Sequence, residues 1–226
     1  MSIIPVKRLH QPQGHVRTVA PAVEPVTADD LRDYLRETAD GLPDAEANAL
    51  IQEAREISED MSGIAFNTQT WLLALDTWPG RAAEPWWNGV RQGAISELYG
   101  GDGDVDLPRW PLQSVTGINV YASDGTASAV NVSTVFDVDT YRQPGRIAVK
   151  FGQSLPVTYR RTNGVEITYV AGYGDDAGDV PAALKRAVKQ LAGYLYTHRG
   201  DGCEPGVAYR ASGAAAILDS KRARRI

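Results

Sequence analysis

The 226-residue sequence has few of the side chains from which catalytic and metal centres are usually built. Its one cysteine, Cys203, excludes a disulfide within the chain and is typical of proteins made in a reducing cytoplasm. Its three histidines, His10, His15 and His198, are not expected to converge, so metal or triad chemistry has little support. No GxSxG motif is present. We therefore predict that the chain is not an enzyme and holds no cofactor or metal.

Long hydrophobic runs are also missing. No apolar stretch approaches the ~20 residues that span a bilayer, and no hydrophobic segment of a secretory signal follows Lys7 and Arg8. A hydrophobic content of 43% with 23% charged residues is that of an ordinary globular protein. We expect a protein that is soluble and intracellular when synthesised, with no membrane partner.

Basic charge is concentrated at the two ends of the chain. Residues 1–20 carry a net charge of +3 and residues 207–226 carry +4, which leaves −12 for residues 21–206 out of the total of −5. An acidic body argues against a protein that clamps nucleic acid along its length. The basic ends are compatible with tails that dock on a partner, and equally with tails that only aid solubility.

Residues 165–200 hold the clearest pattern, a strand followed by a helix. Apolar residues alternate from Val165 to Ala171, and glycines end the strand. Asp179 and Pro181 are expected to cap a helix over 180–199 whose aliphatic residues recur at helical spacing. This strand and helix are predicted to be buried in the core and to carry no catalytic group.

The remaining patterns predict helices before and after a group of strands. Residues 1–26 read as an extended or disordered arm, and residues 27–62 as helices with a capping box at Thr27. Strands are expected within 64–172, with a hairpin of 130–138 and 146–151 and an irregular insertion at 80–106. The predicted class is α+β: a bundle of N-terminal and C-terminal helices with an inserted antiparallel β lobe. A loop after Gly200 leads into a C-terminal segment, 203–226.

Two segments partly match ligand-binding motifs but lack residues that those motifs require. Asp102, Asp104 and Asp106 match the start of a calcium loop, but the glycine and the closing glutamate are missing. The run GYGDDAGD at 172–179 links a strand to a helix without a phosphate-loop signature, and its aspartates would repel phosphate. An acidic loop and a capped turn are the better interpretations.

Trp86 and Trp87 are adjacent within the insertion and cannot easily face one core together. They form either a small local core under the loop or an aromatic anchor at a protein interface. The sequence leaves both interpretations open.

Several segments, in this order, resemble the head–tail connector (adaptor) proteins of long-tailed bacteriophages and gene transfer agents. The matching segments are VTADDLRDYL, LPRWPLQSVTGINVY with its Asp-Gly turn, PGRI, VEITYVAGYG, VPAALKRAVKQLAGYLYTHRGD and ILDSKRARRI. The resemblance runs from about residue 27 to the end. The insertion 80–106 and the long N-terminal arm depart from it.

This resemblance implies a structural protein of the virion, located at the head–tail junction and assembled in the bacterial host cytoplasm. It implies a ring of identical subunits, expected to be a dodecamer, beneath the portal protein, with a stopper or other neck or tail protein as the next partner. Double-stranded DNA would pass through the ring without sequence-specific binding. We further hypothesise that basic residues of the C-terminal segment dock on the portal: Arg210, Lys221, Arg222, Arg224 and Arg225.

Three other functions remain as alternatives. The chain could be a DNA-binding accessory protein that uses its basic termini, although the −12 body speaks against this. It could be a neck stopper or tail terminator, although the helices at both ends point away from those mostly β proteins. A small hydrolase is the least favoured, since no nucleophile and base stand at a suitable spacing.

Overall fold

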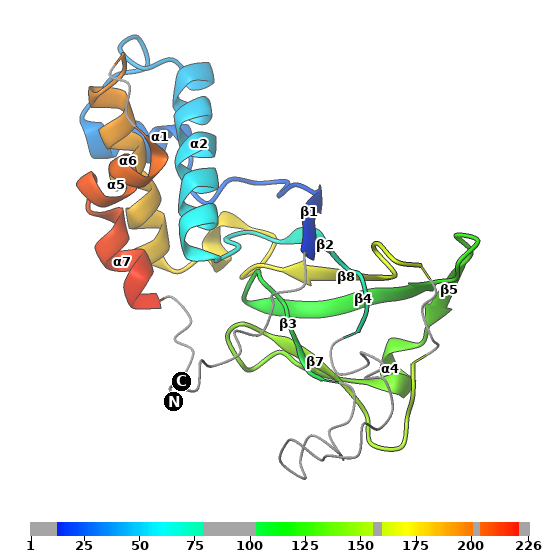
Figure 1. Cartoon of the computed structure of the whole chain (residues 1–226). Helices are drawn as coiled ribbons and strands as arrows, with labels where there is room; N and C mark the ends of the chain where they lie inside the picture. Colours follow the sequence, from blue (N-terminus) through cyan, green and yellow to red (C-terminus); the bar gives the residue numbers. More distant parts are fainter. Residues whose placement is uncertain (1–12, 79–102, 156–159, 201–203, 222–226) are drawn as a thin grey trace, which may run out of the picture.

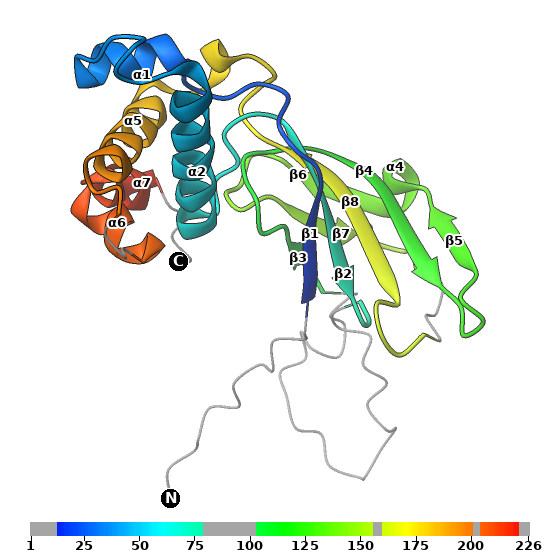
Figure 2. The same cartoon turned by 90° about the horizontal axis from the view of Figure 1, so that it is seen from above.

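The computed structural model describes residues 13–78, 103–155, 160–200 and 204–221 (Figure 1). The helices gather into a bundle on one side, and the strands form a β lobe on the other, as the two views show (Figures 1 and 2). The predicted α+β class, a helical bundle with antiparallel strands, is confirmed. Within these ranges, the helices lack the length and apolar character that crossing a bilayer requires.

The N-terminal helices are α1 (Ala28–Leu35) and α2 (Asp44–Ser62). The predicted capping box is present, since the Asp30 amide donates to the Thr27 hydroxyl at 3.1 Å and the Asp30 carboxylate accepts from the Thr27 amide at 3.2 Å. α2 ends at Gly63, whose φ of 79° is a left-handed conformation that glycine adopts without strain. The apolar residues of α2 at helical spacing face the bundle core.

The C-terminal part of the bundle consists of α5 (Ala182–Thr197), α6 (Pro205–Ala211) and α7 (Ala214–Lys221). The sequence led us to expect a loop with Pro205 after Gly200, but residues 205–211 form α6. Its seven residues are too few to show a helical period, and tertiary burial of Ala208 and Tyr209 stabilises it. The helices share one core, formed with the following buried residues: Leu31, Leu42, Ile51, Ile64, Leu184, Val188, Leu191, Tyr209 and Leu218.

The start of α5 differs from the expected cap. Pro181 is the N-cap residue, and no side chain caps the helix there. The Asp179 carboxylate accepts instead from the Asp176 amide at 3.1 Å, within a single 3-10 turn, η1 (Ala177–Asp179). The acidic run therefore stabilises its own turn before the helix begins.

The larger sheet has five strands, and each neighbouring pair is antiparallel. In spatial order they are β1 (Gln13–Val19), β2 (Gln69–Leu75), β8 (Val165–Ala171), β4 (Leu112–Tyr121) and β5 (Ala127–Val130). Residues 13–19 thus form an edge strand of the sheet, not part of a free arm as expected. The interrupted alternation around Arg17 hides this strand in the sequence, because a register shift falls between Arg17 and Val19.

The smaller sheet has three strands in the order β3 (Val105–Asp106), β7 (Arg146–Val149) and β6 (Phe136–Asp139). The predicted hairpin is confirmed, with β6 and β7 antiparallel. Two expectations are wrong: β3 lies within the predicted insertion 80–106, and Val132–Val135 form the short helix α4 instead of extending the strand. Asn131 caps this helix through a 3.1 Å hydrogen bond from the Thr134 amide, which overrides the β-branched valines.

A second core fills the space between the two sheets. Trp78 lies in it against Phe136, with ring centroids 5.2 Å apart. The Trp78 Nε1 donates to the Gly103 carbonyl at 2.9 Å, so the chain leaves and re-enters the lobe at one place. Residues 79–102 between them, including Trp86 and Trp87, lie outside the described residues.

Candidate functional site

The joint between the bundle and the β lobe is built around a buried carboxylate, Glu59, near the end of α2. Its Oε1 accepts from the Phe66 amide at 3.0 Å and from Gln69 Nε2 at 2.5 Å. Its Oε2 accepts from Arg55 at 2.9 Å, and Arg55 also donates to Glu24 at 2.7 Å. Burial raises the pKa of the Glu59 carboxyl, while the Arg55 charge opposes that rise. A buried ion pair with both carboxylate oxygens hydrogen-bonded ties the end of the helix to the start of the sheet.

Arg109, in the segment before β4, makes the second link. Its guanidinium donates to the Glu59 carbonyl and to the Asp60 carboxylate, both at 2.5 Å. The same group lies 4.5 Å from the centre of the Trp71 ring on β2. An arginine can do both because its planar fork hydrogen-bonds at the edge and stacks on its face. One side chain therefore contacts both lobes.

His15 of β1 also contacts the Trp71 indole. It stacks on Trp71 with ring centroids 4.6 Å apart, and its Nε2 lies 2.9 Å from the Tyr169 hydroxyl. Burial, helped by the charge of Arg109, lowers the pKa of His15 to about 4. Burial likewise raises the pKa of Tyr169. The neutral imidazole can accept a hydrogen bond from the Tyr169 hydroxyl at Nε2. The His15–Tyr169 pair is therefore uncharged near pH 7 and positions side chains without transferring protons.

These contacts fix the angle between the lobes. Arg17 of β1 pairs with Glu56 at 3.0 Å, so the edge strand is fastened directly to α2. Arg55 and Glu59 stand four residues apart on α2, the spacing of an ordinary helix ion pair. The burial of this pair depends on the sheet packing behind it, which no local pattern reveals.

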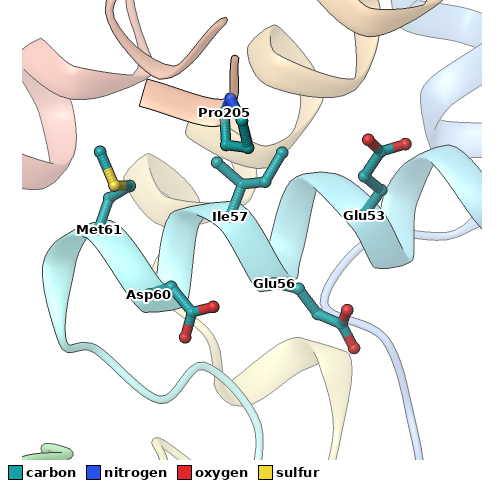
Figure 3. A pocket seen from close by; sticks show the side chains of 6 residues that line it. All are labelled: Glu53, Glu56, Ile57, Asp60, Met61 and Pro205. Carbon is teal, nitrogen blue, oxygen red and sulfur yellow. The ribbon is translucent and has the colours of Figure 1, made fainter. Parts of the chain in front are cut away.

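A groove with an apolar floor and acidic rim runs between α2 and the start of α6 (Figure 3). Ile57 and Met61 of α2 face Pro205 of α6 across it. Three carboxylates line the same stretch of helix: Glu53, Glu56 and Asp60. Glu56 pairs with Arg17 and Asp60 with Arg109, whereas Glu53 makes no ion pair or hydrogen bond with any residue that the structure describes. The sequence analysis missed this groove because α6 was not expected.

The predicted docking residues are only partly described. Arg210 lies exposed on α6, and Lys221 is the exposed last residue of α7. Arg222, Arg224 and Arg225 lie outside the described residues, as do Trp86 and Trp87. Residues 204–221 of this segment belong to the bundle, because α6 and α7 bury Ala208, Tyr209, Ala214 and Leu218 in the bundle core.

The other residues singled out in the sequence have ordinary surroundings where they are described. Asp104 pairs with Arg146 at 2.8 Å, and Asp106 lies 3.9 Å from Arg142. His198 stacks on Tyr194 at the end of α5. In the described ranges, no three His, Cys, Asp or Glu side chains gather into a metal-binding group. Cys203, His10 and Asp102 lie outside those ranges.

The fold as a whole is similar to chains in solved particles. One is in the neck of an empty gene transfer agent (GTA) particle computed with C6 symmetry, with a TM-score of 0.68 and 24% identity over 94% of this chain and 97% of that one. The fold is that of a GTA neck chain. A chain in the neck of a native GTA particle computed with C12 symmetry gives a TM-score of 0.61 and 24% identity over 95% and 97% of the two chains.

A chain in the virion of a native GTA particle is also similar, with a TM-score of 0.65 and 22% identity over 94% of this chain and 96% of that one. The similarity to GTA neck chains therefore covers both the bundle and the β lobe. No protein-family model matches the sequence, and no curated protein matches it.

Proposed function

We propose that this protein is a structural head–tail connector (adaptor) of a phage or gene transfer agent particle. It forms a ring beneath the portal protein, extends the DNA channel and attaches the next neck or tail component. The observation that supports this best is the likeness to GTA neck chains over nearly the whole length of both partners. We propose a ring of twelve copies, which is compatible with both the C6 and the C12 symmetry with which those necks were computed.

The joint described above suits such a part. A ring made of head-to-tail contacts closes only if every subunit presents its two contact surfaces at the same angle. Glu59 and Arg109 hold the bundle against the β lobe with directional, charge-assisted hydrogen bonds. This buried polar network thus gives a rigid subunit of fixed shape.

The charge distribution suits a DNA channel. Residues 21–206 carry −12, so a lumen lined by this body makes few phosphate contacts and lets the duplex slide. The basic end of the chain is free to serve a different partner. We assign portal docking to Arg210, Lys221, Arg222, Arg224 and Arg225.

Co-purification with the portal protein of the same particle, followed by imaging, tests the connector. A ring bound to the portal is expected. A chain that binds no portal but binds duplex DNA in a salt-sensitive manner would be an accessory DNA-binding protein instead. A ring found only on the tail side of another neck protein would identify a stopper or terminator.

The docking assignment is tested by truncation after Lys221, since removal of 207–226 would also strip buried residues such as Leu218 from the bundle. Loss of three arginines should weaken portal binding about tenfold or more while the melting temperature stays unchanged. A variant with Arg142, Arg160 and Arg161 changed to glutamine removes three exposed arginines from the β lobe and is the matched control. Equal effects of the two variants would refute specific docking.

We also assign Trp86 and Trp87 to a contact with a neighbouring subunit or another neck protein. Bulky aromatic residues are the usual anchors of such contacts. Trp86→Ala combined with Trp87→Ala should impair ring assembly or tail attachment. Unchanged assembly and attachment would leave the two residues with a local packing role only.

A further inference from the structure

One side chain on the β lobe is fully exposed although it is large and apolar. Phe151 has a relative exposure of 107%, as open as in an extended peptide. It lies in a hydrogen-bonded turn, in which the Gln153 amide donates to the Lys150 carbonyl at 3.0 Å and Gly152 adopts a φ of 78°. The turn is anchored to the lobe because the Lys150 amide donates to the Val135 carbonyl at 2.8 Å. An aromatic ring held out on a defined turn is a candidate interface anchor.

The groove between α2 and α6 is chemically suited to receive such a ring. Its floor of Ile57, Met61 and Pro205 offers apolar surface, and a methionine sulfur makes favourable contacts with aromatic rings. The residue before Phe151 is Lys150, whose Nζ donates to the Ser133 carbonyl at 2.6 Å and lies 3.9 Å from the Asp137 carboxylate, so its ammonium keeps N–H donors for a further carboxylate. The groove's rim holds Glu53, a carboxylate without a partner among the described residues. Apolar knob and apolar floor thus come with opposite charges beside them.

The two features lie on opposite sides of one molecule. Phe151 follows the contact with the end of α4, and α4 lies at the far side of the β lobe from α2 and α6 in both views (Figures 1 and 2). A knob on that side cannot reach its own groove. Two different complementary patches on opposite sides are what a head-to-tail contact between identical subunits requires.

We infer that Phe151 of one copy inserts into the groove formed by Ile57, Met61 and Pro205 of the next copy, with Lys150 facing Glu53. The partner is a second copy of this chain. This contact rests on the proposed ring and supplies one of its subunit interfaces.

The test uses one variant for each side of the contact. Phe151→Ser removes the knob at a position without packing, so its melting temperature should equal that of the wild type. Ile57→Lys fills the groove with a cation, and its ammonium can pair with Glu53 four residues earlier. Because Ile57 is half-buried against the bundle core, the assembly of this variant is measured below its own melting temperature, which is determined first. Each variant alone should weaken self-association about tenfold or more, measured by sedimentation velocity with and without the portal protein.

Mixing the two variants gives the decisive measurement. The Phe151→Ser chain keeps an intact groove and the Ile57→Lys chain keeps an intact knob, so together they should form a one-to-one dimer and nothing larger. No dimer in the mixture would overturn the contact. Tyr141→Ser is the control, because Tyr141 is 98% exposed at the other end of the same hairpin. If Tyr141→Ser weakens assembly as much as Phe151→Ser does, nonspecific association of exposed aromatic side chains is responsible and the proposal is wrong.

The results also separate this contact from the proposed function. If both single variants still assemble rings on the portal as the wild type does, the connector function stands and the knob-and-groove contact is refuted. If Phe151→Ser forms normal rings but loses the next neck protein, the knob serves that protein instead and the contact is again refuted. If the wild type neither self-associates nor binds portal, the function fails together with the contact.

Discussion

The guanidinium of Arg109 lies 4.5 Å from the centre of the Trp71 ring, and from there it reaches back to α2. Its two terminal nitrogens hydrogen-bond to the Glu59 carbonyl and the Asp60 carboxylate. One side chain is therefore stacked on the β lobe and hydrogen-bonded to the bundle, in addition to the links made by Glu59 and Arg17. Arginine is the one residue whose geometry allows this combination.

Arg109→Lys should consequently destabilise the protein by about 1–3 kcal/mol, because an ammonium cannot stack as a plane while donating in two fixed directions. Denaturant unfolding followed by tryptophan fluorescence measures the loss. Arg142→Lys is the matched control, since Arg142 is exposed and makes one long contact with Asp106 at 3.9 Å. Its effect should stay below about 0.5 kcal/mol. Equal losses in both variants would mean that Arg109 does not join the lobes.

Glu59→Gln should cost about 2–4 kcal/mol, since it leaves the buried Arg55 short of one negative partner and presents an amide donor to other donors. Unfolding free energies in urea provide the measurement. Glu56→Gln, one turn away on the exposed side of α2, removes only partly exposed ion pairs and should cost less than about 1 kcal/mol. A Glu59→Gln loss no greater than that of Glu56→Gln would contradict the structural role of the buried pair.

The sequence allowed the bundle and the central strands to be predicted because those segments obey simple local rules. The 44–62 helix, the capping box at Thr27 and the 165–171 strand each follow from spacing and caps. The edge strand at 13–19 and the short helix α6 could not be predicted in this way, since each is stabilised by contacts with distant residues. His15 illustrates the difference: its neighbour Tyr169 is 154 positions away.

The hydrophobic and charged groups that form the candidate contact surfaces were even harder to predict from the sequence than these elements. Phe151 looks like the end of a buried strand in the sequence, and only the turn at Gly152 exposes it. Ile57 and Met61 belong to the apolar stripe of α2, yet the short α6 leaves them half open beside Pro205. The candidate contact surfaces therefore depend on two irregular segments that have no periodic signal.

His15 should make the stability depend on pH below neutrality. Its pKa is lowered from 6.5 to about 4 in the folded protein, by burial first and by Arg109 second, while Asp60 acts weakly in the opposite direction. The unfolded chain therefore binds the proton more readily, so this stabilisation is complete above about pH 6.5 and is lost as the pH falls toward about 4. Partial exposure of the ring limits the expected loss to roughly 1–2 kcal/mol.

His15→Gln tests this dependence, because glutamine does not titrate and can still hydrogen-bond to Tyr169. Above pH 6.5 the free energies of unfolding of the two proteins should change with pH in the same way. Below pH 6.5 the free energy of unfolding of the wild type should fall more steeply than that of the variant. Parallel curves from pH 7 to pH 4 would show that His15 titrates normally. Measurement at several salt concentrations separates this step from the general repulsion of charges at low pH.

Gly172 makes the closest approach between backbone segments at the end of β8. Its φ is 139°, and a Cβ placed on it would lie 2.5 Å from the Asn67 carbonyl oxygen, at the point where the bundle gives way to the sheet. Gly172→Ala should therefore destabilise the protein by more than about 2 kcal/mol, since both the backbone conformation and the rigid carbonyl oppose a methyl group.

Gly117→Ala is the matched control, because a Cβ on Gly117 of the neighbouring strand meets nothing within 4 Å. Its melting temperature should stay close to that of the wild type or rise slightly, since alanine restricts the unfolded chain. The Gly172→Ala variant should also assemble poorly, because a shift at this point changes the angle between bundle and β lobe on which ring closure depends. Full stability of Gly172→Ala would mean that the Asn67 segment can move aside, and the joint would then be less rigid than its hydrogen bonds indicate.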